Sequence, residues 1–342
     1  MELIVTHASG GPLVQDYLAG EASAQAFFNG HYADGASFEA KAREVSARFD
    51  RDARERAVAA LTVPTGAEPA RLEAFVERGG YMVTTGQQPG LFGGPMYSMY
   101  KALTAVRLAE ALEGRLGLPV IPVFWVASED HDWAEANHTH LIGVDNELHR
   151  FELEQPDADR SPPLHRIPMG AEVAAVVEAF ASHLPETEFA PEQIDLLRAA
   201  FVQAETIPTA FHRVMHQLLG RFGIFFTDAA DPAVKAGTAD VLLRELAHCE
   251  EHEGLLRDRA AALEAAGYPL QVPILEGGAN LFMEGPAGRE RLYRDPEGFH
   301  LRVSGTLHTE AEVRAARERD ASVLSPNVLL RPVAESALFP TL

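Results

Sequence analysis

Hydrophobic residues recur at every third or fourth position along several charged stretches of the chain, a pattern that predicts amphipathic helices. The clearest stretch covers residues 37–61, where the apolar positions are Phe38, Ala42, Val45, Phe49, Ala53 and Ala57. The same pattern predicts helices over residues 69–77, 96–113, 171–183, 241–264 and 310–319, with further helical segments as far as about Gly220. We expect these helices to pack on a core through their apolar faces.

Three continuous apolar runs predict buried strands. They cover residues 81–85, residues 118–126 (LPVIPVFWV) and residues 223–228, which end in an acidic turn. The first two runs flank a predicted helix and so form a β-α-β unit, which implies a parallel sheet and an α/β fold. Pro119 and Pro122 fit least well, because proline donates no hydrogen bond to a strand ladder.

Changes in composition divide the chain into core and inserted segments. Residues 155–170 are rich in proline and charge, which indicates a boundary, and residues 267–308 are glycine-rich with strands expected at 281–283 and 300–303. Residues 326–333 (PNVLLRPV) are expected to return to the core, with a strand over 327–330. The expected organisation is N-terminal helices and the first half of the core (1–150), a mostly helical insertion (151–204), continued core (205–266), a β-rich insertion (267–319) and a return to the core (320–342).

Composition narrows the class of protein. With 50 acidic and 29 basic residues among 342, the net charge of −21 argues against nucleic acid as a partner. No apolar stretch is long enough for a bilayer, and Met1-Glu2-Leu3 does not begin a secretory signal. The single cysteine, Cys249, excludes an internal disulfide and is expected to be a buried small hydrophobe within a helix. These features predict a cytoplasmic protein with no membrane partner.

A glycine-rich loop, GQQPGLFGGP at residues 86–95, joins the first predicted strand to the following helix. Ligands of parallel sheets bind at the carboxyl ends of the strands, glycine lets the backbone approach a ligand, and a helix N-terminus favours an anion. The loop matches neither the P-loop nor the dinucleotide-binding fingerprint, which argues against those enzymes. Lys101, two turns into the helix, either reaches back to a bound phosphate or carboxylate or is an ordinary surface lysine.

The second predicted strand ends in Ser128-Glu129-Asp130-His131-Asp132, and Glu135, Asn137, His138 and His140 follow. Adjacent charges of this kind require water, a cation or a polar ligand. They are either solvated turn residues or residues that recognise an ammonium group or transfer protons, with His131 as the base. The histidine pairs 212/216 and 248/252 have helical spacing but no H-E-x-x-H motif, so no metal is predicted.

Two long segments, GQQPGLFGGPMYSMYKA (86–102) and PVFWVASEDHDWAEANH (122–138), resemble the paired signature of the cysteine-adding enzymes of bacillithiol biosynthesis, the BshC family. The resemblance continues in FFTDAADP (225–232), NLF (280–282) and LSPNVLLRPV (324–333) and so spans the chain. Gly93 departs from it, since threonine is expected there. Family members also continue into more of the core and a coiled-coil arm, so we expect a C-terminally truncated member that lacks this dimerisation arm.

The resemblance implies a Rossmann-like core with connecting-peptide insertions, similar to class I aminoacyl-tRNA synthetases and nucleotidylyltransferases. It implies a ligase that forms an amide between cysteine and glucosaminyl malate, the last step of bacillithiol biosynthesis. Because an amide does not form from a free acid without activation, ATP or another nucleotide is expected. The expected catalytic residues are Lys101, Asp130, His131 and Asp132. The expected substrate- or nucleotide-binding residues are Gly86, Gln87, Gln88, Gly90, Gly94, Tyr97, Ser128, Glu129, Asn137, His138 and Arg331.

In this hypothesis Lys101 neutralises charge at the activated carboxyl, the carboxylates hold an ammonium group, and His131 takes the proton of the attacking amine. Arg331 either binds a carboxylate in bidentate fashion or is a surface arginine. Two other classes are compatible with the sequence. A nucleotidylyltransferase acting on another small substrate would release pyrophosphate without requiring cysteine, and a truncated, non-catalytic copy would bind ligands without turnover.

Overall fold

The computed structural model describes residues 10–64, 69–155 and 160–342. Two predictions fall on residues outside these ranges. They are the absence of a secretory signal at residues 1–3 and part of the boundary expected at 155–170. Among the helices described, none is both long enough and apolar enough to cross a membrane.

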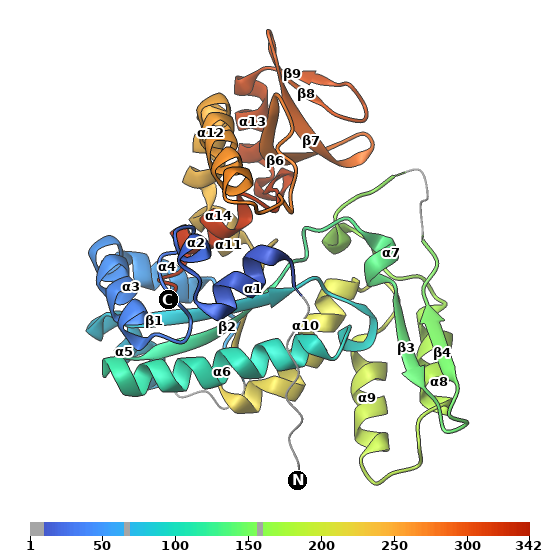
Figure 1. Ribbon diagram of the computed structural model, residues 1–342. Helices are drawn as coiled ribbons and strands as arrows, with labels where there is room; N and C mark the ends of the chain where they lie inside the picture. The colour runs from blue at the N-terminus through green and yellow to red at the C-terminus, as the bar shows by residue number, and fades with distance from the viewer. Residues whose placement is uncertain (1–9, 65–68, 156–159) are drawn as a thin grey trace.

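A three-stranded parallel sheet, in the order β1-β2-β5, forms the centre of the molecule (Figure 1). β1 covers Tyr81–Gln87, β2 covers Val120–Val126 and β5 covers Phe225–Asp228. The predicted α/β fold with a parallel sheet is confirmed. Pro122 is tolerated opposite Val83 of β1, because β2 begins to pair with β5 only at the next residue.

Helices bury both faces of this sheet, which explains the uninterrupted apolar sequence of its strands. All seven residues of β2 are buried. Phe124 packs beneath α6 (Tyr97–Leu116) and α10 (Ile207–Leu219) on one face. Trp125 belongs to the opposite face, which α4 (Arg51–Ala59), α5 (Pro69–Arg78) and α14 (Arg331–Leu338) cover.

The prediction of a single helix over residues 37–61 is wrong, because the chain forms two helices there. These are α3 (Gly35–Arg48) and α4 (Arg51–Ala59). Phe49 leaves the helical conformation, and the side chain of Asp50 accepts a hydrogen bond from Ala53 N at 2.8 Å, which caps α4. The other N-terminal helices are α1 (Pro12–Ala19), α2 (Ala22–Gln25) and α5 (Pro69–Arg78).

A first lateral unit projects from the sheet after β2 (Figure 1). A hairpin that the sequence did not predict, β3 (His138–Ile142) with β4 (Leu148–Glu152), packs on α8 (Val173–Ser182). Trp133 shares a hydrophobic cluster with the helices of this unit, so the unit includes residues on both sides of the expected boundary at 150. Its remaining elements are α7 (Trp133–Ala136), η2 (Leu164–Arg166) and α9 (Ala190–Ala200).

A second lateral unit is a five-stranded antiparallel sheet in the order β10-β6-β7-β8-β9, covered by a long helix (Figure 1). The strands are β6 (Gly278–Gly285), β7 (Gly288–Asp295), β8 (Gly298–Leu301), β9 (Leu307–His308) and β10 (Leu324–Pro326). The helices are α11 (Pro232–Gly237), α12 (Ala239–Ala265) and α13 (Glu310–Arg319). Cys249 of α12 is buried against Leu281 and Leu292, which confirms its expected role as a core residue.

The prediction of a strand over residues 327–330 is also wrong. β10 ends at Pro326 and pairs with β6 of the antiparallel sheet, whereas Asn327 begins a turn. Its Oδ1 accepts hydrogen bonds from Leu329 N at 3.0 Å and Leu330 N at 2.9 Å, so these N–H groups are not available to a strand.

The chain returns to the parallel sheet through α14 (Arg331–Leu338). Phe339 packs edge-on to Trp125. Pro340 O then accepts from Met82 N, and Leu342 N donates to Met82 O, so the last residues run beside β1. The short connecting helices η1 (Leu91–Gly93), η3 (Gly220–Phe222) and η4 (Ala321–Val323) complete the fold.

Candidate functional site

A cavity of about 460 Å³ lies at the carboxyl edge of the parallel sheet, where it meets the antiparallel unit. We call it the sheet-edge cavity. The parallel sheet and the antiparallel unit contribute opposite charges to this cavity. Glu129 and Asp130 follow β2, whereas Arg289 and Arg291 come from β7. Its other lining residues include Gly86, Gln87, Gln88, Trp125, Ala127, Phe282, Asn327, Val328 and Arg331.

A second cavity, of about 490 Å³, lies beyond the glycine-rich loop and is here called the loop cavity. Gln87 and Gln88 line both cavities. Its further lining residues include Pro89, Gly90, Phe92, Gly94, Tyr97, Met99, Glu135, His138 and His140. The structure thus divides the predicted loop residues between two adjacent sites.

The loop glycines are required by the packing of the loop itself. A Cβ at Gly86 would lie 2.7 Å from Trp125 O, and one at Gly90 would lie 2.9 Å from Gly94 Cα. Gly93 has φ +99° and Gly94 has φ +66°, conformations that side chains rarely adopt. The threonine expected at position 93 would therefore be strained in this loop.

Lys101 is exposed and reaches back to the loop. Its Nζ donates to Gly86 O at 3.2 Å and to Gln87 Oε1 at 3.0 Å. Gln87 in turn donates through Nε2 to the Tyr97 hydroxyl at 3.1 Å. Lys101 lines neither cavity, so in this structure it orients Gln87, which faces both.

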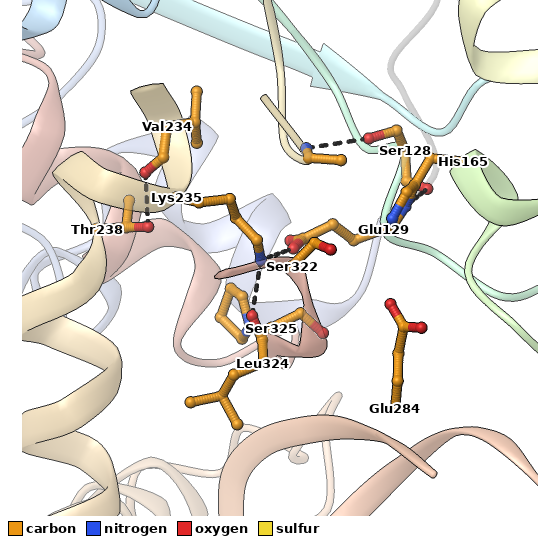
Figure 2. A network of polar contacts seen from close by, with 12 residues as sticks. Ser128, Glu129, His165, Val234, Lys235, Thr238, Glu284, Ser322, Leu324 and Ser325 are labelled. Carbon is orange, nitrogen blue, oxygen red and sulfur yellow. Dashed lines mark hydrogen bonds and ion pairs between the residues drawn. The ribbon is translucent and has the colours of Figure 1, made fainter. Parts of the chain in front are cut away.

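The successive carboxylates after β2 point to different partners, which relieves their repulsion. Glu129 is 8% exposed and forms a buried ion pair with Lys235 of α11, which is 2% exposed (Figure 2). Lys235 Nζ also donates to Leu324 O at 2.6 Å (Figure 2). Burial raises the pKa of the Glu129 carboxyl, and the Lys235 ammonium opposes this increase.

Asp130 and His131 form one group with Arg289. His131 N donates to Asp130 Oδ1 at 2.7 Å, and Asp130 Oδ1 lies 3.5 Å from His131 Nδ1. Arg289 Nη1 lies 3.3 Å from the same Nδ1. Burial would raise the pKa of Asp130, but the hydrogen bonds from His131 and the charge of Arg289 hold it below its usual value.

Ser128 follows β2, is fully buried and contacts the end of β5. Its hydroxyl donates to Asp228 and accepts from Ala230 N at 3.2 Å, while its carbonyl lies 3.2 Å from His165 Nδ1. Burial raises the pKa of Asp228 and lowers that of His165. The contacts of Ser128 make it part of the frame that supports the site.

Three other predicted residues lie on the side of the first lateral unit. Asp132 caps α7 by accepting from Glu135 N at 3.1 Å. Asn137 is buried and donates to Leu153 O at 2.7 Å. His138 lines the loop cavity, and its Nδ1 lies 3.0 Å from Ala134 O.

Arg331 lines the sheet-edge cavity, stands at the start of α14 and bonds Glu335 Oε2 through its Nη1 at 2.7 Å. Sequence reasoning missed Lys235, Arg289 and Arg291. The rarity of lysine, with three in the chain, was the only indication for Lys235. The alternation of Arg289 and Arg291 along β7 could have indicated two side chains on one face of a strand.

The histidine pairs have other partners. Burial lowers the pKa of His212 to about 4, beside Phe226, and His252 Nδ1 lies 2.5 Å from Glu245 Oε2. Within the described ranges, no group of three histidine, cysteine, aspartate or glutamate residues is arranged to hold a metal ion.

The fold and the cavity define an α/β protein with a candidate ligand site at the carboxyl edge of a parallel sheet. A family model described as "Bacillithiol biosynthesis BshC, N-terminal Rossmann-like domain" matches residues 1–342. The chain therefore belongs to this family, which confirms the resemblance and the Rossmann-like core.

Similar curated proteins share the name "Putative cysteine ligase BshC". The one from Koribacter versatilis is 33% identical over 336 residues, which are 96% of this chain and 61% of the relative. The one from Heliobacterium modesticaldum is 33% identical over 78% of this chain and 49% of the relative. The one from Solibacter usitatus is 32% identical over 86% and 53%. The chain thus spans between 49% and 61% of the length of these relatives.

Proposed function

We propose that this chain is the Rossmann-like part of a cysteine ligase that joins the carboxyl of cysteine to the amine of glucosaminyl malate, the last step of bacillithiol biosynthesis. The family and the name of its relatives support this proposal. The observation that carries it is the sheet-edge cavity, in which Glu129 and Asp130 face Arg289 and Arg331. Such opposite charges can bind an amino acid, since carboxylates can hold its ammonium group and arginines its carboxyl group.

Asp130 is the group we assign to the substrate ammonium. Its lowered pKa keeps it ionised at neutral pH, and its side chain is 38% exposed. Glu129 lines the same cavity, but its charge is already matched by Lys235. Glu129 would therefore fix the position of the segment that carries Asp130.

His131 is the proposed acceptor of the proton that the attacking amine releases. Lys101 would stabilise negative charge near Gly86 and Gln87, whose oxygens it already contacts. His131 lies beside Arg289, which lines the sheet-edge cavity, and Lys101 bonds Gln87, where the two cavities meet. A bond formed there would join groups held on either side of the loop.

A nucleotide cosubstrate would supply the activation that an amide requires. The loop cavity fits one, because Phe92, Tyr97 and Met99 line it and offer an apolar surface to a flat base. Gln87 and Gln88 would separate this base from the charged groups of the sheet-edge cavity.

The test is to incubate the purified chain with cysteine, glucosaminyl malate and ATP and to search for the amide product by mass spectrometry. The full-length Koribacter versatilis relative serves as the positive control. Product that depends on cysteine supports the ligase. Pyrophosphate release without a cysteine requirement would instead support a nucleotidylyltransferase, and ligand binding without any turnover would support a binding role for this chain.

A further inference from the structure

Three arginines converge on the sheet-edge cavity of a chain whose net charge is −21. Arg289 and Arg291 occupy alternate positions of β7, and Arg331 begins α14. We call these three residues the arginine wall. Because acidic residues greatly outnumber basic ones, a local excess of guanidinium groups requires an explanation.

Two members of the wall have no carboxylate partner in the described part of the chain. Glu335 pairs with Arg331, but no described carboxylate oxygen lies within 4.0 Å of Arg289 or Arg291. Arg289 instead donates to neutral oxygens, from Nε to Ser325 Oγ and from Nη2 to Pro326 O, each at 2.9 Å. Its guanidinium also lies 4.0 Å from the ring centroid of Phe282. These contacts fix the cation in place without neutralising it.

Arg291 is held by one hydrogen bond, from Nε to Ala279 O at 3.0 Å. Among the residues the structure describes, none accepts a hydrogen bond from its two Nη groups. A half-buried arginine with a fixed Nε and free Nη groups at a cavity wall is arranged to receive an oxyanion. Burial lowers the pKa of Arg289 and Arg291, so an anion would also offset the cost of desolvating their charges.

The spacing indicates which anion. Alternate residues of an antiparallel strand lie about 6.8 Å apart, so Arg289 and Arg291 present two separate guanidinium groups. Two carboxylates joined by a short carbon chain match two such groups, each by a bidentate pair. Glu129 and Asp130 line the same cavity and would repel the denser charge of a polyphosphate.

We propose that the arginine wall binds the two carboxylates of a dicarboxylate. If the proposed function holds, this ligand is the malate arm of glucosaminyl malate, and only that identity rests on the proposed function. The phosphates of a nucleotide are another source of paired oxyanions. Arginine binds phosphates and carboxylates alike through bidentate hydrogen bonds. The experiment must therefore separate the two sources.

Isothermal titration calorimetry of the purified chain with malate, lactate and pyrophosphate makes this separation. Malate should bind at least about tenfold more tightly than lactate, which lacks the second carboxylate. Arg291→Met should weaken malate binding by on the order of tenfold or more, and Arg291→Lys should restore only part of the affinity. Arg319→Met removes the same charge from an exposed position on α13 and should leave malate affinity within about twofold.

Circular dichroism and thermal unfolding establish that each variant is folded. Equal affinity for malate and lactate, or unchanged malate affinity in a folded Arg291→Met protein, would overturn the proposal. Pyrophosphate binding that depends on Arg291 in the absence of malate binding would also overturn it and would assign the wall to nucleotide phosphates. Malate binding that depends on Arg291 would stand even if no cysteine amide were formed, so this result is independent of the ligase assay.

Discussion

At the scale of single residues, the candidate site depends on how each charged side chain is partnered. Asp130 is ionised and accessible, Glu129 is buried with Lys235, and Asp132 caps a helix, although the three are close in sequence. His131 contacts two groups, Asp130 and Arg289, that favour opposite protonation of its Nδ1. Asp130 favours a proton on His131 Nδ1, whereas the N–H of Arg289 requires an unprotonated Nδ1.

We predict that Arg289 sets the tautomer of His131. At a pH where the ring is neutral, the 3.3 Å contact from Arg289 should place the ring proton on Nε2. In Arg289→Met, Asp130 at 3.5 Å should draw the proton to Nδ1, so the nitrogen able to accept a proton should change from Nδ1 to Nε2. The ¹⁵N chemical shifts of the His131 ring distinguish the two tautomers, and identical shifts in both proteins would refute the assignment. Arg319→Met is the matched control and should not alter these shifts.

At the scale of elements, the loop between β1 and α6 is shaped by its glycines and by Lys101. The close approaches at Gly86 and Gly90 leave no room for a side chain, and Gly93 is held at φ +99°. The loop separates the two cavities, so its conformation decides which of its side chains enters each one.

Gly93→Thr, which introduces the residue expected from the family, should destabilise the chain by about 1–3 kcal/mol, because a β-branched side chain is strained at this φ. The space around the position is open, since a Cβ there would lie 3.9 Å from its nearest neighbour, Val214 Cγ1, so backbone strain is the cause. Gly114→Ala, at an exposed helical position of α6, should instead stabilise by about 0.5–1 kcal/mol. Urea unfolding measures both, and a neutral Gly93→Thr would show that the loop relaxes at no cost.

The sequence predicted the helices and strands that depend on the pattern of neighbouring residues. The buried strands β1, β2 and β5 follow from continuous apolar runs, and α13 was predicted at its observed bounds, Glu310–Arg319. The break at Asp50 was missed because apolar spacing continues across it, although aspartate is a favoured cap. The strand expected at 327–330 failed because its apolar residues resemble a core strand, while the side chain of Asn327 takes up the N–H groups of Leu329 and Leu330.

The site was predicted where it follows a strand and missed where distant segments meet. Gly86, Gln87, Glu129 and Asp130 follow β1 or β2, and each lines the sheet-edge cavity. Arg289 lies 158 residues from His131, and Lys235 lies 106 residues from Glu129. No periodicity in the sequence encodes such pairs, because they depend on how the antiparallel unit docks against the parallel sheet.

At the scale of the whole molecule, two sets of ion pairs join the antiparallel unit to the rest. Lys235 of α11 connects Glu129, after β2, to the carbonyl of Leu324 in β10 (Figure 2). Arg166 of η2 reaches Glu284 at 3.1 Å and Asp320 at 2.6 Å. The first connection is buried and the second is partly exposed, so they should contribute unequally to stability.

We predict that Lys235→Met destabilises the chain by about 3–5 kcal/mol, because it leaves the Glu129 carboxylate buried without a partner. The double variant Lys235→Met/Glu129→Gln should recover much of this loss, since an amide carries no charge. Arg166→Met, which breaks exposed pairs, is the control and should cost about 1 kcal/mol or less. Urea unfolding of the four proteins, wild type included, tests the comparison.

The loss in Lys235→Met should also depend on pH in a direction that follows from Glu129. Without Lys235, burial alone acts on this carboxyl and raises its pKa further above the ordinary value of 4.5. Between 4.5 and the raised value, the folded state keeps a proton that the unfolded state has released, so stability falls as pH rises through this window and is constant above it. Lys235→Met should therefore be closest to wild type near pH 4.5 and fall further below it as pH rises from there, whereas Lys235→Met/Glu129→Gln should lack this dependence. A pH-independent loss in the single variant would mean that Lys235 acts through its hydrogen bond to Leu324 O and not through the charge of Glu129.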